Sequence, residues 1–134
     1  MSAADVFYDT NVVLYLLSAD PAKAERAEEV LALGGRVSVQ VLNEIAAVAS
    51  RKLALGWTEI REILDQVRAV CAVDAITVTT HERGLAVAAR YRLHFYDAMI
   101  VASALESGCT VLYSEDLQDG QVFERQLTIR NPFA

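Results

Sequence analysis

The 134-residue sequence has few of the residues that mark several common classes of protein. Its only two cysteines, Cys71 and Cys109, lie in apolar surroundings, so we expect buried thiols rather than a disulfide or a metal site. The only histidines, His81 and His94, lack the spacing of metal ligands. No apolar run approaches the ~20 residues that span a bilayer, and the N-terminus has no secretory signal. We therefore expect a cytoplasmic protein without a membrane segment.

An excess of basic residues is also missing. The sequence has 12 Lys and Arg against 18 Asp and Glu, and its formal net charge is −6, so it lacks the basic surface typical of nucleic-acid-binding proteins. This does not exclude a nucleic-acid partner, because acidic residues that hold divalent cations reverse the local sign of charge. Apolar residues make up 54% of the chain, which indicates a packed core rather than disorder. The length suits a single domain, residues 1–134.

The order of the predicted elements indicates the fold class. Short apolar segments typical of strands alternate with segments of helical periodicity. The predicted strands are residues 6–8, 37–39, 76–78, 111–113 and 127–129, and the predicted helices are residues 21–31, 42–55, 58–71, 80–91 and 96–107. This alternation, with short connections, predicts an α/β fold with a mainly parallel central sheet that is flanked by helices on both faces.

Acidic residues follow two of the predicted strands. Asp9 comes directly after strand 6–8, and Asp116 belongs to the segment that follows strand 111–113. Because the carboxyl ends of parallel strands meet at one edge of a sheet, we expect these two carboxylates to lie together. Each could instead serve only in a turn or as a helix cap.

Two further acids interrupt helices that are otherwise apolar. Glu44 has apolar neighbours all around its helix, and a buried carboxylate there needs a cation, a hydrogen-bond donor or a metal. Alternatively, it pairs with Arg51 or faces solvent. Asp97 begins the apolar helix 96–107, which it could simply cap. Together with Asp9 and Asp116, these acids predict an oxygen-ligand site for Mg²⁺ or Mn²⁺, which could activate water to hydrolyse a phosphodiester.

In their order along the chain, these motifs resemble those of the PIN-domain ribonucleases, and most closely those of the VapC toxins of toxin–antitoxin pairs. The resemblance covers essentially the whole chain, through residues 8–12, 43–44, 96–104 and 114–117. It implies a single PIN-like domain that acts as a metal-dependent endoribonuclease, with Asp9, Glu44, Asp97 and Asp116 as catalytic and metal-binding residues. It also implies a homodimer and a cognate antitoxin protein as partners.

Other residues extend the expected site. The resemblance implies that Asn11 and Ser114 are small polar neighbours of the metal, and Glu115 or Asp119 could assist or serve in turns. The basic residues that could bind RNA phosphates, or could simply form solvated helix faces, are Arg51, Lys52, Arg83, Arg90 and Arg92. Tyr96 and its neighbour Phe95 could stack on an unpaired base, although the apolar helix that follows favours a core position for both.

The sequence argues against two other functions that rely on acidic sites. A phosphatase of the haloacid dehalogenase type needs a second Asp where Asn11 stands, and a receiver domain needs a Lys, but none follows Lys52. Two alternatives stay open. One is a binding module that keeps the PIN fold without activity, and the other is a DNA-cutting nuclease of related chemistry. The sequence does not identify the RNA that would be cut, or choose between Mg²⁺ and Mn²⁺.

Overall fold

Six strands form one sheet in the order β3-β2-β1-β4-β6-β5, in a computed structural model that describes residues 2–134. The strands are β1 Val6–Tyr8, β2 Gly35–Ser38, β3 Cys71–Asp74, β4 Val111–Tyr113, β5 Val122–Phe123 and β6 Leu127–Arg130. Every neighbouring pair is parallel except β5 and β6, which form an antiparallel edge. The predicted, mainly parallel sheet is confirmed.

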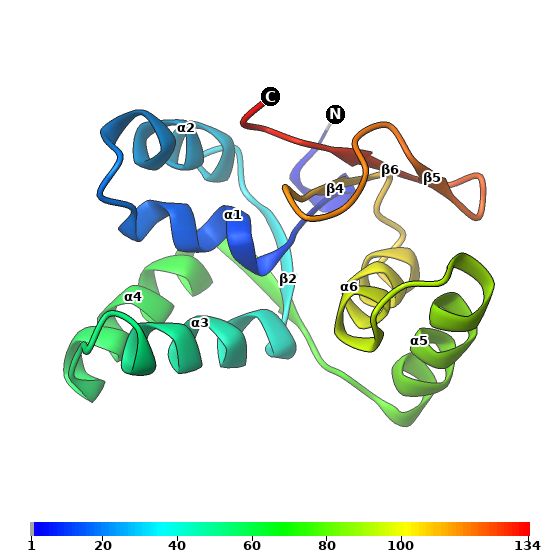
Figure 1. The fold of residues 1–134 in the computed structure, drawn as a ribbon, viewed down its shortest axis with the longest axis horizontal. Helices are drawn as coiled ribbons and strands as arrows, with labels where there is room; N and C mark the ends of the chain where they lie inside the picture. The colour runs from blue at the N-terminus through cyan, green and yellow to red at the C-terminus, as the bar shows by residue number, and fades with distance from the viewer. Residues whose placement is uncertain (1) are drawn as a thin grey trace.

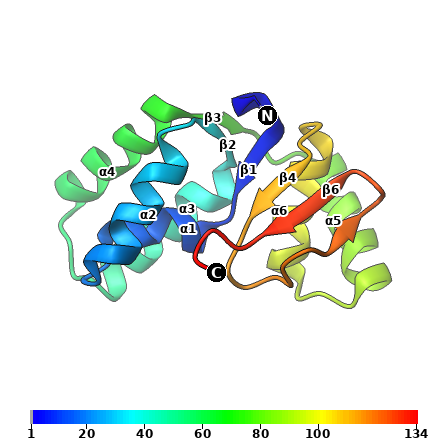
Figure 2. The same cartoon turned by 90° about the horizontal axis from the view of Figure 1, so that it is seen from above.

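Helices cover both faces of this sheet. They are α1 Thr10–Leu14, α2 Pro21–Leu31, α3 Val39–Arg51, α4 Trp57–Val70, α5 Val78–Tyr91 and α6 Phe95–Glu106, with short 3₁₀ turns η1 Ala3–Asp5 and η2 Tyr15–Leu17. Figures 1 and 2 show α1 to α4 on one side of the sheet and α5 and α6 on the other. This division follows from right-handed crossovers, because β1, β2 and β3 progress in one direction and β4 lies on the opposite side of β1.

The strand β1 runs through the centre of the core. Phe7 and Tyr8 are completely buried, and the Tyr8 hydroxyl donates hydrogen bonds to the carbonyl oxygens of Val30 and Gly34, at the end of α2. A Cβ atom at Gly35 would lie 2.3 Å from the Tyr8 ring, so only glycine fits beside it. The start of β2 and the end of α2 are therefore held against β1, whose carboxyl end carries Asp9.

One predicted strand is wrong. Residues 76–78 are not a strand, and the third strand is Cys71–Asp74, directly after α4. Cys71 continues the helical periodicity of α4, but pairing with Gly35 of β2 buries it in the sheet instead. The Thr77 side chain accepts a hydrogen bond from the backbone N–H of Thr80 and caps α5. A helix cap therefore overrides the strand propensity of this β-branched segment.

Smaller differences concern the ends of elements. The strand predicted at 37–39 lies at Gly35–Ser38, because α3 begins at Val39, three residues before its predicted start. The two-residue strand β5 has no counterpart in the prediction, since two residues are too few to show a period. No helix in residues 2–134 has both the length and the apolar character that crossing a membrane requires.

The sheet topology creates a crevice at one edge. β1 and β4 are neighbours with Tyr8 opposite Tyr113, and the chain leaves their carboxyl ends at the point where the strand order reverses. In open α/β sheets, binding sites form at such reversal points. Asp9 and Ser114, the residues that follow these two strands, stand at this point.

Candidate active site

Asp9 is the most deeply buried of the four predicted site acids, with 5% of its surface exposed. It is the N-cap of α1, and its carboxylate accepts hydrogen bonds from the Thr10 backbone N–H at 2.7 Å and from the Ser114 hydroxyl at 2.8 Å. Burial raises the pKa of this carboxyl to about 6. The two hydrogen bonds act against this rise, and the charges of Asp116 and Asp97 add to it. Asp9 is therefore a carboxylate that would gain from a nearby cation.

Glu44 projects from α3 toward Asp9 and is held by two donors. The Thr10 hydroxyl donates to one carboxylate oxygen at 2.5 Å, and the Gln40 amide nitrogen donates to the other at 2.9 Å. The pairing with Arg51 that the sequence left open is absent from residues 2–134, where Arg51 is exposed. Hydrogen-bond donors, rather than a cation of the chain, thus satisfy this half-buried carboxylate.

Asp97 and Asp116 complete the set from the other side of the crevice. Asp97 lies in the first turn of α6 but does not cap the helix, because His94 occupies the N-cap position. Burial raises the pKa of Asp97, and the negative charges of Asp116 and Glu44 raise it further, while His94 lowers it. The side-chain oxygens of Asp97 and of the exposed Asp116 accept no hydrogen bond from any residue in the described range. Both carboxylates are therefore free to bind another group.

These four acids line a single cavity of about 360 Å³ together with Thr10 and Asn11. We call it the carboxylate cavity. Within residues 2–134, however, no three acidic, histidine or cysteine side chains already form a group that could hold a metal ion. Ligation would thus require some of these side chains to move toward one another. Asp97 and Asp116 can do so without breaking a side-chain hydrogen bond.

Ser114 and Asn11, the two small polar residues predicted near the metal, connect the segments that follow β1 and β4. The Ser114 hydroxyl donates to Asp9 and accepts hydrogen bonds from the backbone N–H groups of Asp116 and Leu117, both at 3.2 Å. The Asn11 side-chain oxygen accepts a hydrogen bond from the Glu115 backbone N–H at 3.2 Å. Both side chains thus connect the end of β1 to the loop after β4.

The two other acids of this loop point elsewhere. The Glu115 carboxylate accepts a hydrogen bond from the Tyr15 hydroxyl and lies 3.7 Å from the Lys23 ammonium. Asp119 accepts a hydrogen bond from the Asn131 backbone N–H at 2.8 Å, which ties its loop to the end of β6. Neither residue lines the carboxylate cavity, so their contacts favour a role in the structure of the loop over direct help at the site.

The five basic residues that were candidates for RNA contact do not line this cavity. Arg51 and Lys52 are exposed at the end of α3, and Arg83 is half-buried on α5. Arg90 forms an ion pair with Glu124 at 2.9 Å, and Arg92 ends α5 in the left-handed conformation, with φ of 55°. Their contact with RNA stays a prediction.

Sequence reasoning missed two residues that organise the acids. Thr10 contacts both Asp9 and Glu44, through its backbone N–H and its hydroxyl respectively. Gln40 is 8% exposed and holds Glu44 from one helical turn earlier. A signal existed for both, because Thr10 adjoins Asp9 and Gln40 stands four residues before Glu44, on the same helix face.

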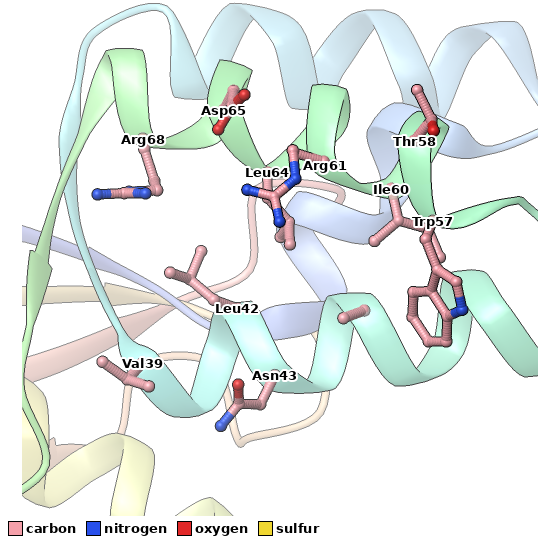
Figure 3. A pocket seen from close by; sticks show the side chains of 11 residues that line it. Val39, Leu42, Asn43, Trp57, Thr58, Ile60, Arg61, Leu64, Asp65 and Arg68 are labelled. Carbon is pink, nitrogen blue, oxygen red and sulfur yellow. The ribbon is translucent and has the colours of Figure 1, made fainter.

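A larger cavity, of about 580 Å³, lies between α3 and α4 (Figure 3). Its lining is mostly apolar and carries one acid, Asp65, beside Arg61 and Arg68. It therefore lacks the group of carboxylates that distinguishes the smaller cavity. Size alone does not locate the chemistry in this molecule.

Comparison with known families matches this arrangement. The family model of the PIN domain matches residues 6–122, which includes all four acids. The chain belongs to the PIN domain family. The resemblance stated from the sequence is thus confirmed at the level of the PIN domain. A comparison with curated protein sequences found no match.

Solved structures with the same fold come from toxin–antitoxin systems. A toxin–antitoxin complex from Klebsiella pneumoniae superposes with a TM-score of 0.71 at 18% identity, over 95% of this chain and 97% of that one. VapC20 of Mycobacterium tuberculosis is described as a toxin that cleaves the sarcin–ricin loop. It superposes with a TM-score of 0.68 at 21% identity, over 83% of this chain and 89% of that one. VapBC2 of Rickettsia felis, bound to a DNA fragment from its promoter, superposes with a TM-score of 0.67 at 16% identity, over 94% of this chain and 97% of that one. At these identities, the likeness shows that the PIN domain described here shares their fold.

Proposed function

We propose that this PIN domain is a metal-dependent endoribonuclease that uses Mg²⁺ or Mn²⁺ in the cytoplasm. The observation that carries the proposal is the convergence of Asp9, Glu44, Asp97 and Asp116 on one cavity at the carboxyl edge of the sheet. The four come from distant parts of the chain, and no ion pair within residues 2–134 neutralises them. A structural set of acids would be expected to have such partners.

The donor set fits a hard divalent cation. All four side chains offer carboxylate oxygens, which are the ligands that Mg²⁺ and Mn²⁺ prefer. The raised pKa values of Asp9 and Asp97 reflect burial and mutual repulsion, both of which a cation would offset. When bound, the cation would supply the positive charge that makes water a nucleophile at neutral pH and stabilises charge on the phosphate.

The chain's own residues would position these acids. Ser114 and Thr10 donate hydrogen bonds to Asp9, so they orient its carboxylate toward the cavity. Gln40 and Thr10 do the same for Glu44. Thr10 thus couples the two acids, and we propose it as a positioning residue. Hydrogen bonds of this kind hold metal ligands in one orientation.

We further propose that the protein is the toxin of a VapBC-type pair and acts with a cognate antitoxin as a homodimer. The support is the fold that it shares with chains of toxin–antitoxin complexes from two bacteria and with a toxin from a third, which is described as cleaving the sarcin–ricin loop. The description of that toxin also makes RNA a better candidate substrate than DNA.

The decisive experiment is a cleavage assay on the purified, antitoxin-free protein. A mixed set of structured RNAs, and matching single-stranded and duplex DNAs, would be incubated with Mg²⁺, with Mn²⁺ and with EDTA. We expect discrete RNA cleavage that requires the metal and is lost in a folded Asp97→Asn variant. Asp65→Asn, which removes the acid of the α3–α4 cavity, is the matched control and should keep full activity.

Each other result would point to a different function. Cleavage that persists in EDTA or in Asp97→Asn would contradict the proposed site. Cleavage of DNA alone would support the alternative nuclease. No cleavage, combined with Mg²⁺-dependent thermal stabilisation that Asp97→Asn removes, would support the inactive binding module.

A further inference from the structure

A second cavity adjoins the carboxylates and has a different lining. Its volume is about 510 Å³, and its walls include Gln40, Asn43, Ile76, Phe95 and Tyr96. We call it the side cavity. It shares Glu44, Ala47 and Tyr96 with the carboxylate cavity, so the two spaces meet along α3 and the start of α6. Its size lies within the range of about 300–1,000 Å³ typical of ligand sites.

Tyr96 stands where the two cavities meet. Its relative exposure is 67%, so the core position favoured by the sequence is wrong for this side chain. The ring of Phe95 packs edge-on against that of Tyr96, with centroids 5.6 Å apart, and Phe95 in turn packs against His81 at 5.7 Å. The Tyr96 carbonyl accepts a hydrogen bond from Gln40 at 3.1 Å. The Tyr96 ring is thus largely exposed beside Asp97, with Phe95 packed against it and its backbone tied to α3 through Gln40.

Gln40 presents a hydrogen-bond acceptor at the same place. Its amide nitrogen donates to the Glu44 carboxylate and to the Tyr96 carbonyl. Both partners only accept hydrogen bonds, which fixes the orientation of the amide and leaves its oxygen, Oε1, free. Within the described residues, Oε1 has no partner, and it is not among the side-chain atoms that are sealed from solvent. A ligand with an N–H donor would satisfy it.

Asn43 adds a second amide at the rim. It is exposed on α3, where it lines both the side cavity and the edge of the α3–α4 cavity (Figure 3). One flat aromatic face and two amides, at the side of a group of carboxylates, match the chemistry that recognises an unpaired base. Such bases stack on aromatic rings while amides form hydrogen bonds with their edges.

We propose that the side cavity binds one unpaired nucleobase of an RNA strand whose phosphate lies at the carboxylates. Tyr96 stacks on the base, while Gln40 and Asn43 form hydrogen bonds with its edge. The free oxygen of Gln40 accepts a hydrogen bond from an amino group or a ring N–H of that base. The inference rests on the proposed function for its choice of RNA, but its test measures binding alone.

The test compares strands with and without bases. Binding of fluorescent oligoadenylate and of an abasic RNA strand of equal length would be measured by anisotropy, with Ca²⁺ present and Mg²⁺ absent. We expect the wild-type protein to bind oligoadenylate about tenfold more tightly or better, which is the scale of one stacked base. Tyr96→Ala should lose this preference, whereas Tyr96→Phe should keep it. Trp57→Ala, at an equally exposed aromatic residue on α4, should also keep it.

A second variant tests the reading of the base. Asn43→Ala should reduce the preference for oligoadenylate over the abasic strand severalfold, because it removes one hydrogen bond to the base, whereas Tyr96→Ala should abolish that preference. Equal binding of the abasic strand, no binding of either strand, or unchanged affinity in Tyr96→Ala would overturn the inference. If binding does not depend on the bases but cleavage depends on metal, only this inference fails. If binding depends on the bases but no metal supports cleavage, only the proposed nuclease fails.

Discussion

The chemistry proposed for this PIN domain depends on the state of one buried side chain, Asp9. Burial raises its pKa from 3.8 to about 6, even though Ser114 and Thr10 donate hydrogen bonds to it. At a pH between these two values, the folded metal-free protein holds a proton that the unfolded chain has released. Stability therefore falls as the pH rises through this interval, and the loss is complete above the pKa of the folded state. A cation at Asp9 would take the place of that proton.

This competition predicts that stabilisation by Mg²⁺ depends on pH. The increase in melting temperature on adding Mg²⁺, relative to EDTA, should be small near pH 5 and should reach its full size above about pH 7. Differential scanning fluorimetry across this range measures it. Ser114→Ala removes one hydrogen-bond donor to Asp9, which raises the pKa of Asp9 further. In this variant the stabilisation by Mg²⁺ should therefore reach its full size only at a higher pH. An equal increase at both ends of the range would show that Asp9 does not bind the cation.

At the scale of elements, the position of Asp97 depends on how closely α5 packs against α6. Gly84 of α5 is buried, and a Cβ atom there would lie 2.3 Å from the Met99 sulfur of α6. Met99 also lines the side cavity, so the same contact forms part of its wall. A glycine inside a helix is unfavourable by itself, and the close contact between the two helices explains why it is tolerated here.

This contact predicts that Gly84→Ala changes the stability of the protein in opposite directions in the presence and in the absence of the Met99 side chain. Gly84→Ala should destabilise the wild-type protein by about 1 kcal/mol, because overpacking outweighs the gain in helix propensity. In the Met99→Ala background, where the space is empty, the same substitution should stabilise the protein. Urea denaturation of the four proteins in this cycle would measure both effects. Stabilisation in both backgrounds would mean that the Met99 side chain moves aside at little cost and that its contact with Gly84 does not limit the packing of α5 on α6.

A polar contact joins β2 and β3 to the end of α6. The Asp74 carboxylate accepts two hydrogen bonds from Arg36 and one from Ser107 at 2.5 Å. Although burial raises the pKa of Asp74, these bonds bring it below its ordinary value. The ionised carboxylate therefore stabilises the fold near neutral pH, and this stabilisation is lost as the pH falls through the pKa of the folded state.

We expect Asp74→Ala to lower the free energy of unfolding by about 1–3 kcal/mol at pH 7, because it leaves the Arg36 charge half-buried without its partner. Chemical denaturation at pH 7 and at acid pH measures the loss, which should shrink in acid. Glu29→Ala removes an exposed ion pair with Arg26 and should change stability little. A loss in Asp74→Ala no larger than in this control would contradict the role of the contact.

At the scale of the whole molecule, the candidate site draws on segments that are far apart in the sequence. Its acids follow β1 and β4 and lie on α3 and α6, so they belong to helices on both faces of the sheet. A cation that binds all of them gains affinity only when both helical layers are in place. Ligand binding should therefore stabilise the entire fold rather than one part of it.

Unfolding should consequently remain a single transition with and without Mg²⁺. Urea curves from far-UV and near-UV circular dichroism should coincide in both conditions and shift together. At a concentration of 100 times the dissociation constant, the shift should correspond to about 2.7 kcal/mol. Asp97→Asn should remove the shift. Separation of the two curves on adding Mg²⁺ would mean that the two helical layers unfold independently.

Local pattern was sufficient to predict the parts of the fold that depend on one segment at a time. The apolar character of residues 98–105 predicted a buried helix, and these residues are buried in α6. The parallel arrangement alone placed the carboxyl ends of β1 and β4, and with them Asp9 and Asp116, at the same edge of the sheet, whereas the structure made the two strands neighbours. The third strand was misplaced because its location depends on pairing with β2, and pairing partners leave no local period.

The sequence by itself determined which acids could form a site, because carboxylates in apolar segments and after strands are visible in one dimension. Only the tertiary structure decided which neighbours they have. It placed Gln40 and Thr10 on Glu44, turned Glu115 toward Tyr15, and exposed Tyr96 beside the cavity. The physical reason is that the hydrogen-bond donors and acceptors around each side chain, and its exposure to solvent, depend on segments that are far away in the sequence. Periodicity records the face that a residue occupies, but not the partner that it meets there.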